Sequence, residues 1–183
     1  NNFKLKKFNE FNILFIGSIC QRKGILYLLR VAKNLKKYKI NLIIVTRSIN
    51  DIYLYKEASK IKNVKIFKNI NNHSLKKVFK ESHVFLLPSL IEGFAHVILE
   101  SMNYGLVPIV SPFCCGPDII KNNKNGYILN PNEINNISEK IIFLYKNRRV
   151  FNSLSKNAFI TSREYTEEEF IKNLNKFFED NIY

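Results

Sequence analysis

Two glutamates flank the stretch of this sequence that is best suited to chemistry. Glu92 and Glu100 are separated by seven residues, and we expect a helix to begin between them, near residues 94–95. The free backbone amides of residues 93–96 would then point at an anion. Glu100 would lie about 7–8 Å along the helix axis, where its carboxylate could accept hydrogen bonds from the two hydroxyls of a ribose. The spacing fits a nucleoside diphosphate, but a capping Glu92 and a solvated Glu100 explain it equally well.

A lysine precedes a second expected helix. Residues 17–24 follow an apolar run and place Lys23 directly before the helix, where free amides and the positive end of the helix dipole favour an anion. The segment lacks the Gly-x-Gly-x-x-Gly pattern of dinucleotide sites and the spacing of a Walker loop. From this segment alone, a phosphate-binding lysine and a capping turn with a solvated lysine both remain open.

The charge balance is strongly basic. The 183 residues include 29 Lys and Arg against 15 Asp and Glu, which gives a net charge of +14. Such a surplus can attract nucleic acid, an anionic membrane surface or phosphorylated ligands. The lysines are spread along the whole chain, however, so composition explains the charge better than a dedicated polyanion surface does. We expect no nucleic-acid partner, because the aromatic residues fall mostly on apolar stripes and not on stacking platforms.

Several classes of protein are excluded by what the sequence lacks. Cys20, Cys114 and Cys115 form no Cys-x-x-Cys pair, which disfavours a disulfide framework and a structural zinc site. The three aspartates are far apart, so we expect no metal site built on clustered aspartates. No apolar run reaches the roughly 20 residues that a bilayer requires, and residues 1–7 are polar and basic, unlike a signal peptide. We therefore expect a cytoplasmic protein.

Six short apolar runs predict strands. They are mostly apolar on successive residues, as expected for strands that are covered on both faces. The runs are 13–16, 42–45, 64–67, 84–87, 107–110 and 127–129. Segments of helical period lie between several of them, the clearest being the stripe of Ile25, Leu28, Leu29, Ala32 and Leu35. The alternation predicts an α/β fold with a doubly wound, mostly parallel six-stranded sheet.

Beyond residue 130 the pattern changes to helices alone. Apolar stripes at helical spacing lie within 134–145, 151–158 and 170–178. Thr166, followed by three glutamates, predicts the N-cap of the last of these helices. We expect a single domain over residues 1–183, with an α/β core over 12–130 and a helical carboxyl-terminal segment over 131–183.

The residues around the two glutamates resemble a family motif. Residues 92–110, EGFAHVILESMNYGLVPIV, look like the E-x7-E motif of retaining GT-B glycosyltransferases of the "group 1" or family 4 set, typically E-G-F-G-x-x-x-x-E-A-M-A-x-G-x-P-V-I. Further landmarks stand in the family's order: the first-strand glycine followed by Lys23-Gly24, Pro88-Ser89, Gly116-Pro117-Asp118-Ile119-Ile120 and Asn125-Gly126-Tyr127-Ile128-Leu129. The resemblance covers about residues 11–180. It implies the Rossmann-like, nucleotide-sugar-binding carboxyl-terminal half of a GT-B fold, without the amino-terminal half that binds the acceptor.

The resemblance also implies a role for each matching residue. Lys23 would bind the donor diphosphate, Glu92 would lie beside the donor sugar, and Glu100 would bind the ribose hydroxyls. Lys23 and Glu92 would be catalytic, since a cation at the helix terminus stabilises the charge that grows on the leaving diphosphate. The donor would be a UDP-, GDP- or ADP-linked sugar, bound without a metal or other cofactor. The other donor-binding positions that it implies are Gly17, Ser18, Arg22, Gly93, Phe94, Ala95, His96 and Val97.

Several positions depart from the family's pattern. Ser18 replaces the arginine that usually follows the first-strand glycine, and Arg22 is a cation that could reach the same phosphate. His83 stands where aspartate often precedes the Pro-Ser strand. Ser101 and Asn103 stand where alanines are typical.

Two hypotheses of function follow. In the first, the chain is the donor-binding domain of a retaining glycosyltransferase that transfers a sugar to a glycan or lipid-linked acceptor, in the cytoplasm or at the inner face of the membrane. This chain alone would turn over little, because the acceptor-binding half is missing. In the second, it is a non-catalytic GT-B-like binding or structural subunit in glycan assembly. Convergence of Lys23, Glu92 and Glu100 on one pocket would favour the first.

Overall fold

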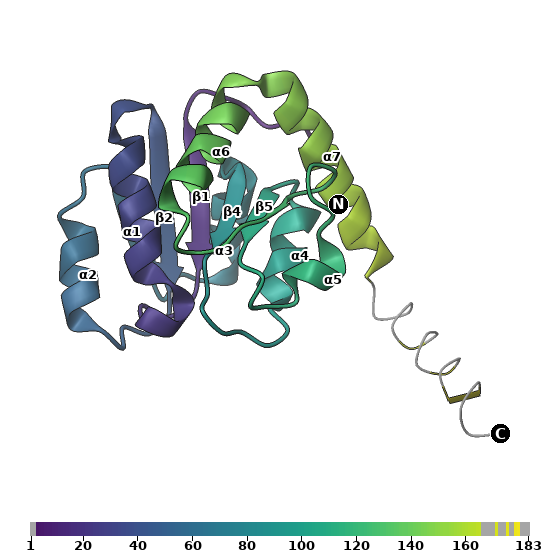
Figure 1. Ribbon diagram of the computed structural model, residues 1–183, viewed down its shortest axis with the longest axis horizontal. Helices are drawn as coiled ribbons and strands as arrows, with labels where there is room; N and C mark the ends of the chain where they lie inside the picture. Colours follow the sequence, from purple (N-terminus) through teal and green to yellow (C-terminus); the bar gives the residue numbers. More distant parts are fainter. Residues whose placement is uncertain (1–2, 166–170, 172–174, 176–177, 180–183) are drawn as a thin grey trace.

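The computed structural model describes residues 3–165, 171, 175, 178 and 179 (Figure 1). Six strands form one sheet in the order β3-β2-β1-β4-β5-β6, and every neighbouring pair is parallel. The predicted doubly wound sheet is confirmed, and it is parallel throughout. The strands are β1 (Phe11–Ile16), β2 (Ile40–Thr46), β3 (Val64–Lys68), β4 (Val84–Leu87), β5 (Val107–Val110) and β6 (Tyr127–Ile128).

Helices cover both faces of the sheet. Right-handed crossovers place α1 and α2 on one face and α3, α4 and α5 on the other. Figure 1 shows α6 beside α1 and α7 beside α4, and these pairs are in contact. The helices are α1 (Ile25–Asn34), α2 (Ile52–Ser59), α3 (Asn72–Glu81), α4 (His96–Asn103), α5 (Gly116–Ile119), α6 (Ile134–Lys146) and α7 (Arg148–Glu164). Within the described ranges, no helix combines the length and the apolar character that crossing a bilayer requires.

The position of each strand explains its residue pattern. All residues of β4 are buried, because the strand has neighbours on both sides and helices on both faces. The edge strand β3 has one neighbour, and its residues are only half-buried or exposed. The apolar runs of the sequence therefore mark the central strands most clearly.

Side-chain caps start two of the crossover helices. The carboxylate of Asp51 accepts a hydrogen bond from the Leu54 amide at 2.9 Å before α2, and Asn71 accepts one from the Ser74 amide at 2.9 Å before α3. The sequence pattern singled out no helix at α2, which buries only two apolar residues. The closing helix predicted from Thr166 lies almost entirely outside the described residues.

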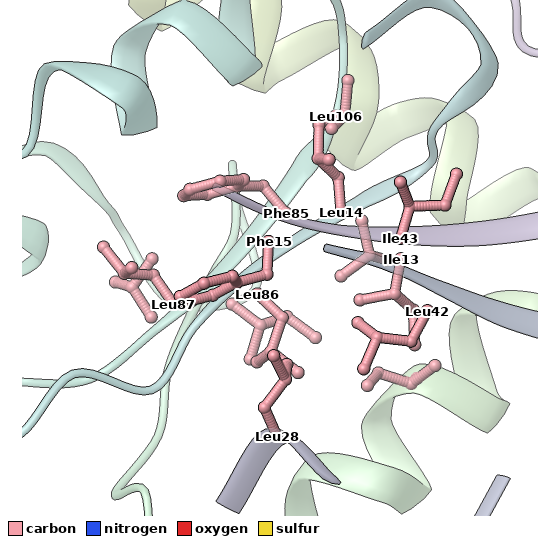
Figure 2. Close-up of a cluster of buried hydrophobic side chains, with 14 of the residues drawn as sticks. Ile13, Leu14, Phe15, Leu28, Leu42, Ile43, Phe85, Leu86, Leu87 and Leu106 are labelled. Carbon is pink, nitrogen blue, oxygen red and sulfur yellow. The ribbon is translucent and has the colours of Figure 1, made fainter. Parts of the chain in front are cut away.

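The apolar core fixes the sheet between its helical layers. Figure 2 shows Phe15 of β1 and Phe85 of β4 among aliphatic side chains that include Leu28 of α1. Phe15, Phe85 and Leu28 are all 0% exposed. Burying a side chain of this size stabilises the fold by about 1.5–3 kcal/mol. The carboxyl ends of the strands are thus rigid anchors for the loops that follow them.

The strand order reverses between β1 and β4. The connection after β1 leads to β2 on one side of the sheet, whereas the connection after β4 leads to β5 on the other. Doubly wound sheets bind their ligands beyond the carboxyl ends of the strands at such a switch point. Residues 17–24 and 88–95 flank this switch point.

Candidate active site

A glycine brings the loops after β1 and β4 into direct contact. Residues 21–23 form a single 3-10 turn, and Gly24 follows in the left-handed region with φ of 73°. A Cβ atom added at Gly24 would lie 1.8 Å from the carbonyl oxygen of Pro88. Only glycine allows both this backbone conformation and this approach. The first turn of α1 is therefore held against the end of β4.

Two of the predicted site residues meet across this contact. The ammonium of Lys23 donates a hydrogen bond to the carboxylate of Glu92, and the side chains are 16% and 15% exposed. The Leu90 amide donates to the Arg22 carbonyl at 2.9 Å, which ties the two backbones together beside the pair. The Arg22 guanidinium donates to the Ile91 carbonyl at 3.2 Å and lies 3.8 Å from Glu92. Two cationic side chains therefore lie within 4 Å of one carboxylate at the switch point.

Gly17 and Ser18 belong to the loop after β1, which also carries Lys23. A Cβ atom added at Gly17 would come within 3.7 Å of the Lys23 side chain. The Ser18 hydroxyl accepts a hydrogen bond from the Ser48 hydroxyl at 2.8 Å, and the Ile19 amide donates to the Ser48 carbonyl at 3.0 Å. Ser48 was not among the predicted site residues, although its place shortly after the apolar run 42–45 is a signal that could have identified it. The loop after β2 thus supports the loop after β1.

The backbone amides before α4 are only partly free. The His96 amide donates to the Phe94 carbonyl at 3.1 Å. Burial raises the pKa of the Cys115 thiol, whereas a hydrogen bond from the Ala95 backbone to the Cys115 sulfur lowers it. The Ala95 amide therefore already has an acceptor. Within the part of the chain that the structure describes, the amides of Gly93 and Phe94 have no acceptor. These two remain available to an anion.

Glu100 lies on α4 and takes no part in the ion pair of Lys23 and Glu92. It is exposed and one turn beyond His96 and Val97, on the same helix face. The His96 ring contacts Phe94 at 4.8 Å between centroids. Partial burial raises the pKa of the Glu100 carboxyl. Glu100 lies four residues after His96, about 6 Å along the helix axis. Its carboxylate makes no ion pair with any described residue.

His83 is a core residue. Its ring is 2% exposed, Nδ1 accepts a hydrogen bond from the Asn12 amide at 3.2 Å, and Nε2 lies 2.7 Å from the Lys7 carbonyl. Burial lowers the pKa of His83 to about 4, so the ring is neutral and donates from Nε2. Among the described residues, no three His, Cys, Asp or Glu side chains gather closely enough to hold a metal ion.

The sequence and the fold together identify the family. The family model described as "Glycosyl transferases group 1" matches residues 1–161. This chain belongs to the glycosyl transferases group 1 family. The resemblance of the motif around Glu92 and Glu100 to that family is thereby confirmed.

Relatives of this group 1 chain are longer than it is. It is 32% identical over 145 residues to an uncharacterized 41.2 kDa protein in the cps region of Klebsiella pneumoniae, covering 74% of this chain and 39% of that protein. It is 29% identical over 159 residues to the UDP-Gal:alpha-D-GlcNAc-diphosphoundecaprenol alpha-1,3-galactosyltransferase of Escherichia coli, covering 83% of this chain and 41% of that protein. The chain therefore spans about two fifths of the length of these relatives.

A solved glycosyltransferase shares the fold. The crystal structure of a glycosyltransferase from Rickettsia africae superimposes with a TM-score of 0.82 at 19% identity, over 93% of this chain and 48% of that one. The group 1 chain thus has the architecture of one Rossmann-like half of a GT-B enzyme.

Proposed function

We propose that this group 1 chain is the donor-binding domain of a retaining glycosyltransferase, which takes a sugar from a nucleoside diphosphate and transfers it to a glycan or a lipid-linked acceptor. The observation that carries the proposal is the meeting of Lys23 and Glu92 at the switch point of the sheet. The two side chains come from different loops, and both are largely shielded from water. A cation and a carboxylate would then both lie beside the sugar–phosphate bond.

The chemistry follows from these charges. As the bond between the anomeric carbon and the diphosphate oxygen breaks, negative charge grows on the diphosphate and positive charge on the sugar ring. The negative charge on the diphosphate would be stabilised by Lys23, by the Gly93 and Phe94 amides and by the positive end of α4. The positive charge on the sugar ring would be stabilised by the Glu92 carboxylate. Because these groups supply the positive charge, we propose that the donor binds without a metal ion. Arg22 would add to the positive charge beside Lys23.

The nucleoside end of the donor is assigned to Glu100. Its carboxylate lies beyond the amides of α4, at a distance along the helix that suits a ribose. Two hydroxyls donating to one carboxylate would fix the nucleoside and so the diphosphate. Ser18, held by Ser48, would lie on the phosphate side of the donor site.

We assign acceptor binding to the whole protein and not to this chain alone. The relatives extend well beyond this chain, so we propose that the acceptor-binding part lies in sequence outside it. The names of the relatives support glycan assembly: one gene lies in a cps region, and one enzyme glycosylates a diphosphoundecaprenol-linked sugar. We propose a cytoplasmic enzyme that works at the inner face of the membrane, where such an acceptor is anchored.

A calorimetric titration tests the donor site. UDP, GDP and ADP are titrated into the chain, with UDP first because the E. coli relative uses UDP-Gal. We expect one nucleotide to bind, and Lys23→Ala and Glu100→Ala each to weaken it about tenfold or more, the loss of a charged hydrogen bond. The control Lys36→Ala removes an exposed lysine that lies away from the switch point. If none of the three nucleotides bound to a folded chain, the hypothesis of a non-catalytic subunit would be favoured.

A further inference from the structure

Glu92 links the loop that carries it to the loops on both sides. Strand β4 lies between β1 and β5, so the loop after β4 lies between the loops that follow those two strands (Figure 1). On the β1 side, the Glu92 carboxylate accepts a hydrogen bond from Lys23. On the β5 side, the Glu92 amide donates to the Phe113 carbonyl at 2.9 Å. Lys23 and Phe113 therefore belong to loops on opposite sides of the loop that carries Glu92.

The loop after β5, residues 111–115, is a third part of the candidate active site. Besides the bond from Glu92 to Phe113, its Cys115 sulfur accepts a hydrogen bond from the Ala95 backbone. One loop thus holds both ends of the segment that leads from Glu92 into α4. The position of Phe113 is therefore fixed relative to the Glu92 backbone.

This third loop carries no charge near neutral pH. Its sequence over 111–115 is Ser-Pro-Phe-Cys-Cys. Burial raises the pKa of both the Cys114 and the Cys115 thiols, so both remain protonated. The loop after β1, by contrast, places the cations of Arg22 and Lys23 beside the same carboxylate. A charged diphosphate is favoured on the β1 side, and an uncharged group on the β5 side.

Two phenyl rings of the site loops are exposed to solvent. Phe94 is 53% exposed and Phe113 is 46% exposed, although a phenyl ring gains free energy when it is removed from water. Open space adjoins this part of the loop, because a Cβ atom added at Gly93 would meet no atom of the described residues within 4 Å. Exposed apolar surface beside polar groups is typical of a binding site.

A sugar ring has both kinds of surface that such a site recognises. Its hydroxyls can donate to a carboxylate, and its C–H groups form an apolar face that packs against an aromatic ring. In the proposed function, the phosphate contacts Lys23 and the bond that breaks lies beside Glu92. The sugar would then extend away from Lys23, toward the loop that carries Phe113.

We propose that the Phe113 ring binds the apolar face of the donor sugar. The inference rests on the proposed donor site and adds to it a sugar-binding residue. Phe113 lies between the motif segments 92–110 and 116–120, so the resemblance to the family assigns it no role. Its contact with the sugar is separate from the groups that hold the diphosphate and the ribose.

Calorimetric titration of sugar conjugates against the free nucleotide tests the proposal. UDP-Gal and UDP-Glc are titrated beside UDP, or GDP-mannose beside GDP and ADP-glucose beside ADP if one of those nucleotides binds instead. We expect Phe113→Ala to weaken the conjugate about three- to tenfold, as the loss of a ring contact does, and to leave the free nucleotide unchanged. Phe113→Tyr keeps the ring and should keep most of the affinity.

The control Phe143→Ala removes a ring of similar exposure, 42%, on α6 and should change neither affinity. The Phe113→Ala chain is expected to fold, because the ring is half exposed and the bond from the Glu92 amide uses a backbone carbonyl that alanine retains. A circular dichroism spectrum of each variant checks this. A weaker conjugate is then due to the ring itself.

Two outcomes would overturn this inference alone. The first is an unchanged affinity of Phe113→Ala for the conjugate. The second is an equal loss of affinity for the conjugate and for the free nucleotide, which would assign the ring to the phosphates or to the support of the loop. If the native folded chain bound neither the nucleotides nor their conjugates, the proposed donor site would be wrong, and the role of Phe113 would be wrong with it.

Discussion

The ammonium of Lys23 donates a hydrogen bond to the carboxylate of Glu92 across the point where the strand order reverses. The carboxylate therefore compensates the charge that the proposed diphosphate would use. We expect Glu92→Gln to leave nucleotide binding intact or to tighten it a few-fold, since the amide keeps an acceptor but removes the competing charge. Calorimetry with the nucleotide that the native chain binds, at two ionic strengths, measures this change.

The matched variant Lys23→Ala has the opposite expectation, a loss of nucleotide affinity. If Glu92→Gln and Lys23→Ala weakened the nucleotide equally, the carboxylate would be needed to hold Lys23 in place. The assignment of Glu92 to the sugar would then be wrong.

The sequence predicted the sheet well because the fold depends on local apolar runs. All six runs are strands, and the stripe from Ile25 lies on α1. The helix α2 was missed because only Leu54 and Ala58 of its residues are buried, which is too weak a stripe to recognise. A periodic pattern reveals an element only when one of its faces is well covered.

The contact between two of the predicted site residues could not be predicted from the sequence. Lys23 and Glu92 are separated by 69 positions, and nothing local to either shows that they form a pair. The sequence likewise implied four free amides before α4, whereas the structure engages those of Ala95 and His96 in the loop. Such contacts depend on how two loops pack, which the spacing of residues does not determine.

Gly24→Ala is expected to destabilise the chain and to separate the two site loops. The added methyl group would overlap the Pro88 carbonyl and would occupy a backbone conformation that alanine disfavours. We expect a loss of about 1–3 kcal/mol in the free energy of unfolding, measured by urea denaturation. Gly93→Ala is the matched control, because no atom lies within 4 Å of the added Cβ there. Equal losses for both variants would contradict the close contact.

Glu100 is expected to select nucleotides by their ribose. The native chain should bind the preferred nucleotide about tenfold more tightly than its 2′-deoxy form, and Glu100→Gln should lose most of that preference. Because burial raises the pKa of this carboxyl, the preference should weaken on acidification at a higher pH than for an ordinary glutamate. Glu139→Gln, an exposed change on α6, is the control. Unchanged discrimination in Glu100→Gln would leave Glu100 as a solvated residue of the helix.

His83 is expected to make the fold sensitive to acid. Its pKa is lowered from 6.5 to about 4 in the folded chain, so between these values the unfolded chain binds the proton and the folded chain does not. The contribution to stability is complete above about pH 6.5 and is lost as the pH falls toward 4, by about 3.5 kcal/mol at about 1.4 kcal/mol per pH unit. Lys6, with a folded pKa of about 7, is charged in both states over most of this window and adds little to the slope.

Urea unfolding of the native chain and of His83→Gln at several pH values between 4 and 7 isolates this effect. The glutamine side chain can still accept from the Asn12 amide but has no proton to take up, so its unfolding free energy should fall less steeply on acidification. His73→Gln, a change at an exposed histidine on α3, should keep the native slope. Parallel curves for all three proteins would mean that His83 takes up its proton at the same pH in the folded and the unfolded chain. Its hydrogen bonds to Asn12 and Lys7 would then have to be reassigned.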